Sequence, residues 1–160
     1  MFTGKLLGKR VLIENKKAVG KLENKAYGTM DGGKLYLDLV EAYYLVEKGK
    51  LSIEGEKDIL TNVKEERDFA VRFFVYKDLR DRGRLVKAGF KYGAHFRVYC
   101  GGIESHAEYL IQAIDEKESL QSYEIAQAAR MANTVNKKMI LAFVDMENDI
   151  TYIDVKRIRL

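Results

Sequence analysis

Three polar residues in the second half of the chain carry functional groups suited to acid-base chemistry without a metal. Tyr99 ends a strand-like run, His106 is one of two histidines and follows two glycines, and Lys137 lies at the end of a predicted helix. A phenol, an imidazole and an ammonium can supply a base for a ribose 2′-hydroxyl, an acid for the leaving 5′-oxygen and a cation for the charge on phosphorus. Together they allow metal-free cleavage of an RNA phosphodiester.

Each of these residues also has a simpler interpretation. Lys137 could complement the dipole at the end of its helix, His106 could be an ordinary loop histidine, and Tyr99 a half-buried aromatic at a strand end. A free tyrosine has a pKa of about 10, so a tyrosine base needs neighbouring cations. The chemistry therefore depends on whether the fold brings the three residues together.

A metal-dependent nuclease is the competing hypothesis. Asp145, Glu147 and Asp149 form a tight acidic cluster, and Mg²⁺ prefers carboxylate oxygens. The cluster falls in a predicted hairpin loop and lacks the calcium-loop pattern, so a solvated turn explains it equally simply. On the residues alone, a magnesium site at this cluster stays the alternative to chemistry that needs neither a metal nor a cofactor.

The composition is that of a globular protein with a moderately basic surface. The chain has 160 residues, of which 47% are hydrophobic, and a formal net charge of +4. Its single cysteine, Cys100, excludes an internal disulfide and a multi-cysteine zinc site. There is no apolar run of about 18 residues and no signal-type segment, so we expect a cytoplasmic protein that does not enter membranes.

The apolar patterns predict a small mixed domain over residues 1–64. Short strands are expected at residues 9–14 and 18–22 around a polar turn, followed by an amphipathic helix over 35–48 and a strand at 51–55. The glycine at position 49 ends the predicted helix.

Residues 65–160 are predicted to form a second domain with a mixed sheet and one internal helix. A long helix over 61–83 leads into it and ends at Arg82 and Gly83. The remaining elements are strands over 85–91, 95–99, 109–114, 138–144 and 150–158 and a helix over 122–136. This order predicts the α/β (α+β) fold class.

The helix over 122–136 is the element that would position polar groups. Ser122 is its expected N-cap, and its buried side is predicted to carry Ile125, Ala128, Ala129, Ala132 and Val135. Arg130 and Lys137 then fall on the polar side.

Two long motifs resemble the catalytic subunits of archaeal tRNA-splicing endonucleases. They are "VYKDLRDRGRLVKAGFKYGAHFRVY" at 75–99 and "ANTVNKKMILAFVD" at 132–145, with His106 between them. Upstream, "LYLDLVEAYYLVEKGKLSI" at 35–53 resembles the N-terminal domain of the family, whereas residues before Leu35 match in style only. The resemblance implies a restriction-endonuclease-like second domain.

The resemblance also implies the catalytic roles. Tyr99 matches the general base, His106 the general acid, and Lys137 the lysine that stabilises the transition state. Members of the family remove introns from precursor tRNA at bulge-helix-bulge sites, without a metal, and leave 2′,3′-cyclic phosphate and 5′-hydroxyl ends. Substrate choice by RNA shape agrees with the hidden base edges of A-form helices.

Further implied roles concern RNA binding and assembly. Arg130 matches an arginine that stacks on a bulge base, with Tyr152 as its expected stacking partner. The loop of Asp145, Glu147 and Asp149 matches one that inserts into a basic groove of a neighbouring subunit, and the strand over 150–158 matches one that pairs two subunits.

The family occurs in several assemblies, so the resemblance implies an oligomer without fixing its composition. Because the N-terminal domain looks trimmed, we expect a catalytic subunit that works with a structural partner, most simply in a tetramer, and a homotetramer is the alternative. A non-catalytic RNA-binding subunit is less compatible with the retained Tyr99, His106 and Lys137.

Overall fold

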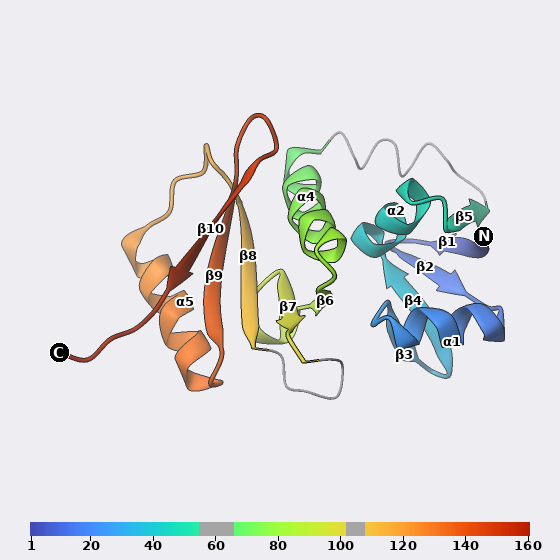
Figure 1. The fold of residues 1–160 in the computed structure, drawn as a ribbon, viewed down its shortest axis with the longest axis horizontal. Helices are drawn as coiled ribbons and strands as arrows, with labels where there is room; N and C mark the ends of the chain where they lie inside the picture. Colours follow the sequence, from blue (N-terminus) through green and yellow to red (C-terminus); the bar gives the residue numbers. More distant parts are fainter. Residues whose placement is uncertain (55–65, 102–107) are drawn as a thin grey trace. The chain divides into compact units, whose positions relative to one another are not determined.

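The computed structural model describes residues 1–54, 66–101 and 108–160, which form two compact units (Figure 1). Unit 1 comprises Met1–Phe73 and unit 2 comprises Phe74–Leu160. Each unit contains a five-stranded mixed sheet with helices, which confirms the α/β class.

Unit 1 is built on a sheet with the strand order β3-β4-β2-β1-β5. Strands β1 and β5 pair in parallel, and the other neighbours pair in antiparallel. Gly4 in β1 is buried, and a Cβ at this position would lie 2.6 Å from Cγ1 of Val11. Only glycine therefore fits at position 4. The elements are β1 (Phe2–Leu7), β2 (Arg10–Ile13), α1 (Lys16–Asn24), β3 (Thr29–Asp31), β4 (Lys34–Asp38), α2 (Leu39–Glu47) and β5 (Leu51–Glu54).

A buried carboxylate fixes the start of α2. Asp38 caps the helix by accepting from the backbone N–H of Glu41 at 2.8 Å, and the Glu41 carboxylate accepts in return from Asp38 N at 3.0 Å. The other oxygen of Glu41 accepts from the N–H of Gly28, also at 3.0 Å. Glu41 is only 6% exposed, and these backbone donors compensate its charge.

Two sequence predictions in unit 1 were wrong. Residues 18–22, expected as a strand, lie in helix α1, because the Asn15 side chain caps its first turn and Ala18 and Leu22 face the core four residues apart. The helix expected over 35–48 begins only at Leu39, since residues 34–38 pair with β2 as strand β4. Strands β1 and β3 were not predicted.

Unit 2 is built on a sheet with the strand order β10-β9-β8-β7-β6, in which only β8 and β9 pair in parallel. Helix α5 connects these two strands, as a parallel pair requires. The elements are α4 (Arg67–Asp81, entering from unit 1), β6 (Leu85–Ala88), the 3₁₀ turn η1 (Phe90–Tyr92), β7 (Phe96–Tyr99), β8 (Tyr109–Asp115), α5 (Ser122–Thr134), β9 (Lys138–Val144) and β10 (Ile150–Val155).

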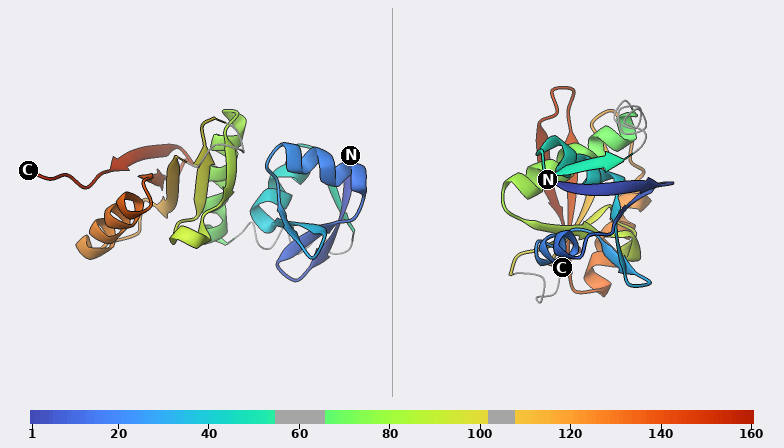
Figure 2. Two further views of the ribbon diagram at one scale, coloured as in Figure 1. Left: turned by 90° about the horizontal axis from the view of Figure 1, so that it is seen from below. Right: turned by 90° about the vertical axis from the view of Figure 1, so that its right-hand side faces the viewer.

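Helices α4 and α5 cover opposite faces of this sheet (Figure 2). On one face, Leu110 packs with Ala132 of α5, and on the other the rings of Phe96 and Tyr76 of α4 lie 5.6 Å apart between centroids. Alternate residues of each strand therefore face α4 and α5.

Part of the motif at 75–99 serves the fold rather than the chemistry. Arg80 is 8% exposed, and its guanidinium donates to the hydroxyl of Tyr76 and to the carbonyl of Val86, both at 3.0 Å. The side chain thus ties α4 to the strand that follows it.

Several predicted boundaries in unit 2 shift in the structure. The N-cap of α5 is Gln121 rather than Ser122, and Ile125, expected in the core, is 38% exposed. The strand expected over 85–91 ends at Ala88 before η1, and the strand expected over 150–158 ends at Val155. Strand β9 has the predicted bounds, and β8 runs one residue further than expected.

Candidate active site

Tyr99 is the last residue of β7 and is half-buried. Two residues earlier on the same side of the strand, the Arg97 guanidinium lies 5.8 Å from the centroid of the Tyr99 ring. Arg97 pairs with Leu110, which faces α5. The side chain of Tyr99 therefore belongs to the α5 face of the sheet, with a cation beside it.

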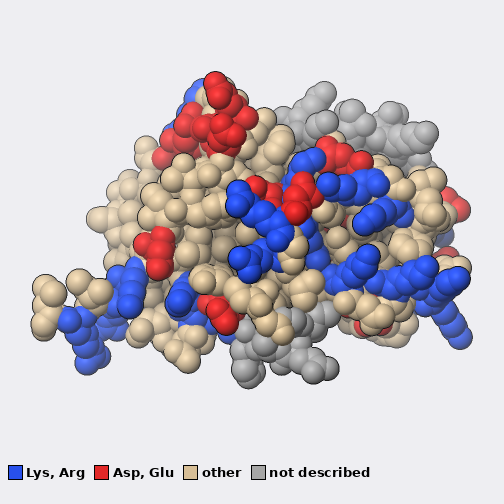
Figure 3. All heavy atoms as spheres, viewed as in Figure 1, with Lys and Arg blue, Asp and Glu red and all other residues tan. Residues whose placement is uncertain are grey.

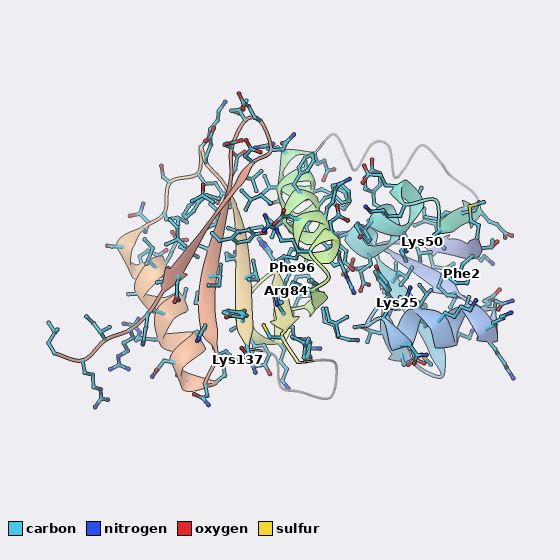
Figure 4. All side chains as sticks on the ribbon, viewed as in Figure 1. Phe2, Lys25, Lys50, Arg84, Phe96 and Lys137 are labelled. Atoms are coloured by element: carbon cyan, nitrogen blue, oxygen red, sulfur yellow. The ribbon has the colours of Figure 1, made fainter. Side chains whose placement is uncertain are left out.

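Lys137 occupies the short connection between α5 and β9 (Figure 4). The chain leaves the helix through Asn136, whose φ of 56° is left-handed, and the Lys137 N–H then donates to the carbonyl of Ala132 at 2.8 Å. The ammonium nitrogen lies 5.5 Å from the centroid of the Tyr92 ring, within the range of a cation–π contact. Backbone and ring together direct this side chain.

The strand register brings Tyr99 and Lys137 to the same end of the sheet. Val98 pairs with Tyr109, and Tyr109 pairs with Lys138 in one row across three strands. Tyr99 and Lys137 each lie one residue beyond this row, with only β8 between them. Two strand spacings correspond to about 10 Å between their backbones, a gap that a phosphodiester can span from side chain to side chain.

His106 lies outside the described residues, in the segment 102–107. The described residue after this segment, Glu108, is fixed at the same end of the sheet, since its N–H donates to Val98 at 3.0 Å and its carbonyl accepts from Lys138 at 2.9 Å. The other histidine, His95, has a structural role, because its Nδ1 accepts from the N–H of Ala113 at 3.0 Å. His95 is therefore occupied in the fold, and the role of His106 stays a prediction from the sequence.

Further charged residues gather at this end of the sheet. Desolvation and the negative charge of Glu108 raise the pKa of the Cys100 thiol, while Arg84 and Lys138 oppose that rise. Cys100 is therefore a neutral thiol and not an activated nucleophile. Arg84 and Lys138 join Lys137 in presenting positive charge, which suits a polyanion.

The structure separates Arg130 from Tyr152. Tyr152 pairs with Ala142 on the α4 side of the sheet, and its hydroxyl donates to Oδ2 of Asp78 at 2.7 Å. Burial and the Asp78 carboxylate raise the pKa of Tyr152. Arg130 is exposed on α5, on the opposite side, so the expected stacking clamp of these two residues cannot form within one chain.

Arg130 instead shares a basic hollow with the end of the chain. A hollow of about 490 Å³ is lined by Arg130, Lys156 and Arg157, and a neighbouring one of about 200 Å³ by Lys137 and Lys138 with the same Lys156 and Arg157. Sequence reasoning missed Lys156 and Arg157, whose only signal is a pair of cations after the last strand.

The acidic hairpin between β9 and β10 is exposed at its tip, where acidic side chains gather (Figure 3). Asp145 is turned inward, because its Oδ1 accepts from the N–H groups of Glu147 at 2.8 Å and Asp149 at 3.0 Å. Glu116 also supports the loop by accepting from Met146 N at 3.1 Å. Asp145 therefore shapes the loop, and Glu147 and Asp149 present charge to solvent.

The described residues contain no group of three or more histidine, cysteine, aspartate or glutamate side chains that could hold a metal ion. In the same part of the chain, no helix is long and apolar enough to cross a membrane.

Comparison with known proteins matches both halves of the chain. Residues 2–65 match the family model of the tRNA intron endonuclease N-terminal domain, and residues 69–152 match that of the tRNA intron endonuclease catalytic C-terminal domain. The first match begins at residue 2, so the expectation that the likeness before Leu35 is only one of style was wrong.

Individual relatives agree with these family models. Proteins described as tRNA-splicing endonuclease are 43% identical in Thermococcus gammatolerans, 41% in Pyrococcus furiosus and 39% in Methanothermobacter thermautotrophicus. The alignments cover 96%, 94% and 98% of this chain and 96%, 93% and 97% of the respective relatives.

Proposed function

The chain belongs to the tRNA intron endonuclease family, and on this basis we propose that it removes introns from precursor tRNA by metal-independent cleavage at bulge-helix-bulge sites. The products would carry 2′,3′-cyclic phosphate and 5′-hydroxyl ends. The observation that supports this best is the register that brings Tyr99 and Lys137 to one end and one face of the sheet, where Glu108 also lies.

In the proposed reaction, the 2′-oxygen of the ribose attacks the adjacent phosphorus while Tyr99 accepts the 2′-hydroxyl proton. The new bond between phosphorus and the 2′-oxygen closes the cyclic phosphate, and the bond between phosphorus and the 5′-oxygen breaks. His106 donates a proton to the leaving 5′-oxygen. The Lys137 ammonium stabilises the negative charge that develops on the non-bridging oxygens.

The basic hollows on the α5 face provide a path for the RNA. Arg130, Lys156 and Arg157 continue from Lys137 along the helix, so the strand beyond the cleaved bond can be bound by its phosphates. In this arrangement Arg130 contacts a bulge nucleotide. Tyr152 can stack on RNA only in an oligomer, in which the Tyr152 of one subunit lies near the RNA that another subunit binds.

An oligomer is part of the proposal. Strand β10 lies at the edge of its sheet, and Ile153 on it is 46% exposed, so a second chain can pair with this edge. The acidic hairpin with Glu147 and Asp149 offers negative charge to a basic groove of another subunit. Two active sites at a fixed separation would then recognise the two splice sites by distance.

The catalytic roles are tested by single-turnover cleavage of a bulge-helix-bulge RNA. Tyr99→Phe, His106→Ala and Lys137→Ala should each reduce the rate by about 10²-fold or more, the range of general acid-base and electrostatic contributions, and leave RNA affinity nearly unchanged. Lys117→Ala, an exposed lysine outside the site, is the matched control. Equal losses of rate and affinity in the three variants would contradict catalytic roles.

A further inference from the structure

Helix α1 in unit 1 has a glycine at the centre of its solvent face. Ala18 and Leu22 form its buried side, and Gly20 lies opposite them on the helical wheel. No atom of a described residue lies within 4 Å of the position that a Cβ on Gly20 would occupy, and the backbone there is helical. Glycine is the least favourable helix-interior residue after proline, and no contact in the described part of unit 1 requires it.

Three exposed lysines surround this glycine. Lys16, Lys17 and Lys21 lie within four residues of Gly20 and outnumber Glu23, the one acidic residue of α1, which is exposed on the same side. None of the three lysines forms an ion pair with a residue that the structure describes. Two of the lysines stand in the first turn, where a helix favours acidic side chains, and that turn contains no acidic residue. The charges oppose helix stability, and a bound polyanion would relieve their repulsion.

We propose that this lysine face, formed by Lys16, Lys17, Gly20, Lys21 and Asn24, binds the phosphodiester backbone of the precursor tRNA outside the cleaved bulge-helix-bulge. That the bound RNA is a precursor tRNA rests on the proposed function, whereas the evidence for the lysine face comes from helix α1 alone.

The chemistry of the face fits a nucleic-acid backbone. Lysine ammonium groups bind phosphates as point charges and do not distinguish base sequences. Such contacts suit the part of a precursor tRNA outside the splice site, because its sequence differs from one precursor to another. The missing side chain at Gly20 lets a sugar-phosphate strand approach the helix closely. The Asn24 amide can donate to a phosphate or to a ribose hydroxyl. Figure 3 shows Lys and Arg side chains gathered on unit 1.

The test compares two RNAs that share one splice site. One is an intron-containing precursor tRNA, and the other is a minimal bulge-helix-bulge hairpin. In Lys16→Glu/Lys17→Glu/Lys21→Glu, KM for the precursor should rise about tenfold or more, while kcat for both RNAs and KM for the hairpin stay within about twofold. The slope of log Kd against log salt for the precursor should fall by about two to three, as expected when three phosphate contacts are lost.

A control with the same change of charge isolates the position of the face. Lys5→Glu/Lys34→Glu/Lys50→Glu alters three exposed lysines of unit 1 outside α1 and should have a clearly smaller effect on the precursor. An equal effect would show that only overall charge matters and would overturn the proposal. An unchanged KM in the α1 variant, or an equal rise for both RNAs, would also overturn it.

Substitution of Gly20 tests close approach without changing charge. Gly20→Gln favours the helix and should raise the melting temperature, yet it should weaken binding of the precursor several-fold. Unchanged binding of the precursor would show that the sugar-phosphate strand does not approach α1 closely at Gly20. If the wild-type protein cuts neither RNA, either alone or with a structural partner subunit, the proposed function fails, and filter binding of the uncut precursor still tests the face by the same comparison of variants.

Discussion

At the scale of single residues, the contact between Lys137 and Tyr92 makes an aromatic ring part of the proposed catalytic arrangement. The ammonium lies 5.5 Å from the ring centroid, and Tyr92 belongs to η1, which precedes the strand that carries Tyr99. The ring thus connects the position of Lys137 to the element that precedes the strand of the proposed base, Tyr99.

Replacing the ring should therefore slow cleavage. Tyr92→Leu should lower the single-turnover rate about tenfold, because loss of a cation–π contact of about 1 kcal/mol is combined with loss of lysine orientation. Tyr92→Phe keeps the ring and should retain nearly the full rate. If both variants are equally slow with equal loss of melting temperature, the role of Tyr92 is only structural.

Tyr152 gives the protein a pH dependence at the alkaline end. Its pKa in the folded state is raised by burial and by Asp78, so the hydrogen bond stabilises the fold fully below the ordinary pKa of 10.0. This contribution is lost as the pH rises from about 10 toward the higher folded-state pKa.

Tyr152→Phe should accordingly be less stable than the wild type by about 1 kcal/mol near pH 8, and this difference should shrink above pH 10. Urea unfolding at several pH values measures this difference in stability. If Tyr152 only stabilises the fold of its own chain, the rate of RNA cleavage at pH 7 should be the same in the variant and the wild type. A constant difference in stability across the pH range would show that ionisation of the Tyr152 phenol is not coupled to folding.

At the scale of elements, the junction of α5 and β9 decides where Lys137 points. Asn136 adopts a left-handed φ of 56°, a conformation that asparagine tolerates and β-branched residues resist. The next residue, Lys137, donates its N–H back to Ala132. The turn therefore sets the direction in which the chain enters β9.

Asn136→Val should cost about 1 to 2 kcal/mol of folding stability and reduce cleavage, because it strains the turn that places the lysine. Asn136→Gly accepts the same φ and should leave both nearly unchanged. Thermal unfolding and single-turnover rates measured together test this, and a fully active valine variant would argue that the turn does not position Lys137.

How well the elements could be predicted depended on whether their signals were local. Strand β9 was predicted with its observed bounds because its apolar run is bordered by Lys137 and by the acidic hairpin. Helix α1 was predicted as a strand, because Gly20 and the lysines conceal its amphipathic side, and the decisive Asn15 cap was not recognised.

The candidate active site could likewise be predicted from the sequence only in part. The residue types and their order indicated Tyr99 and Lys137, but their proximity depends on the pairing of β7, β8 and β9, which sequence patterns do not specify. The separation of Arg130 from Tyr152 likewise follows from which face each strand residue occupies. Contacts such as that of Tyr92 with Lys137 have no sequence signal.

At the scale of the whole molecule, the proposed assembly uses two surfaces, the exposed acidic hairpin and the edge strand β10. Asp145 supports the loop from inside, so removing it would confuse loss of charge with loss of shape. Glu147 and Asp149 can be changed without this difficulty, because their side chains are exposed.

Glu147→Ala/Asp149→Ala should therefore shift the protein toward smaller oligomers in light scattering, with melting temperature little changed. Lys117→Ala/Glu118→Ala, an exposed pair outside the hairpin, is the control. An unchanged mass would show that the hairpin is only a solvated turn. A wild-type protein that is monomeric alone would indicate a structural partner subunit.

We propose that this chain cleaves RNA by transesterification, without a metal. The most direct measurement incubates the purified wild-type protein in EDTA with a bulge-helix-bulge RNA, with and without a candidate structural subunit, and identifies the ends of the products. We expect two cuts that leave 2′,3′-cyclic phosphate and 5′-hydroxyl ends. Cleavage that is absent in EDTA and returns with Mg²⁺, or products with 5′-phosphate ends, would contradict it.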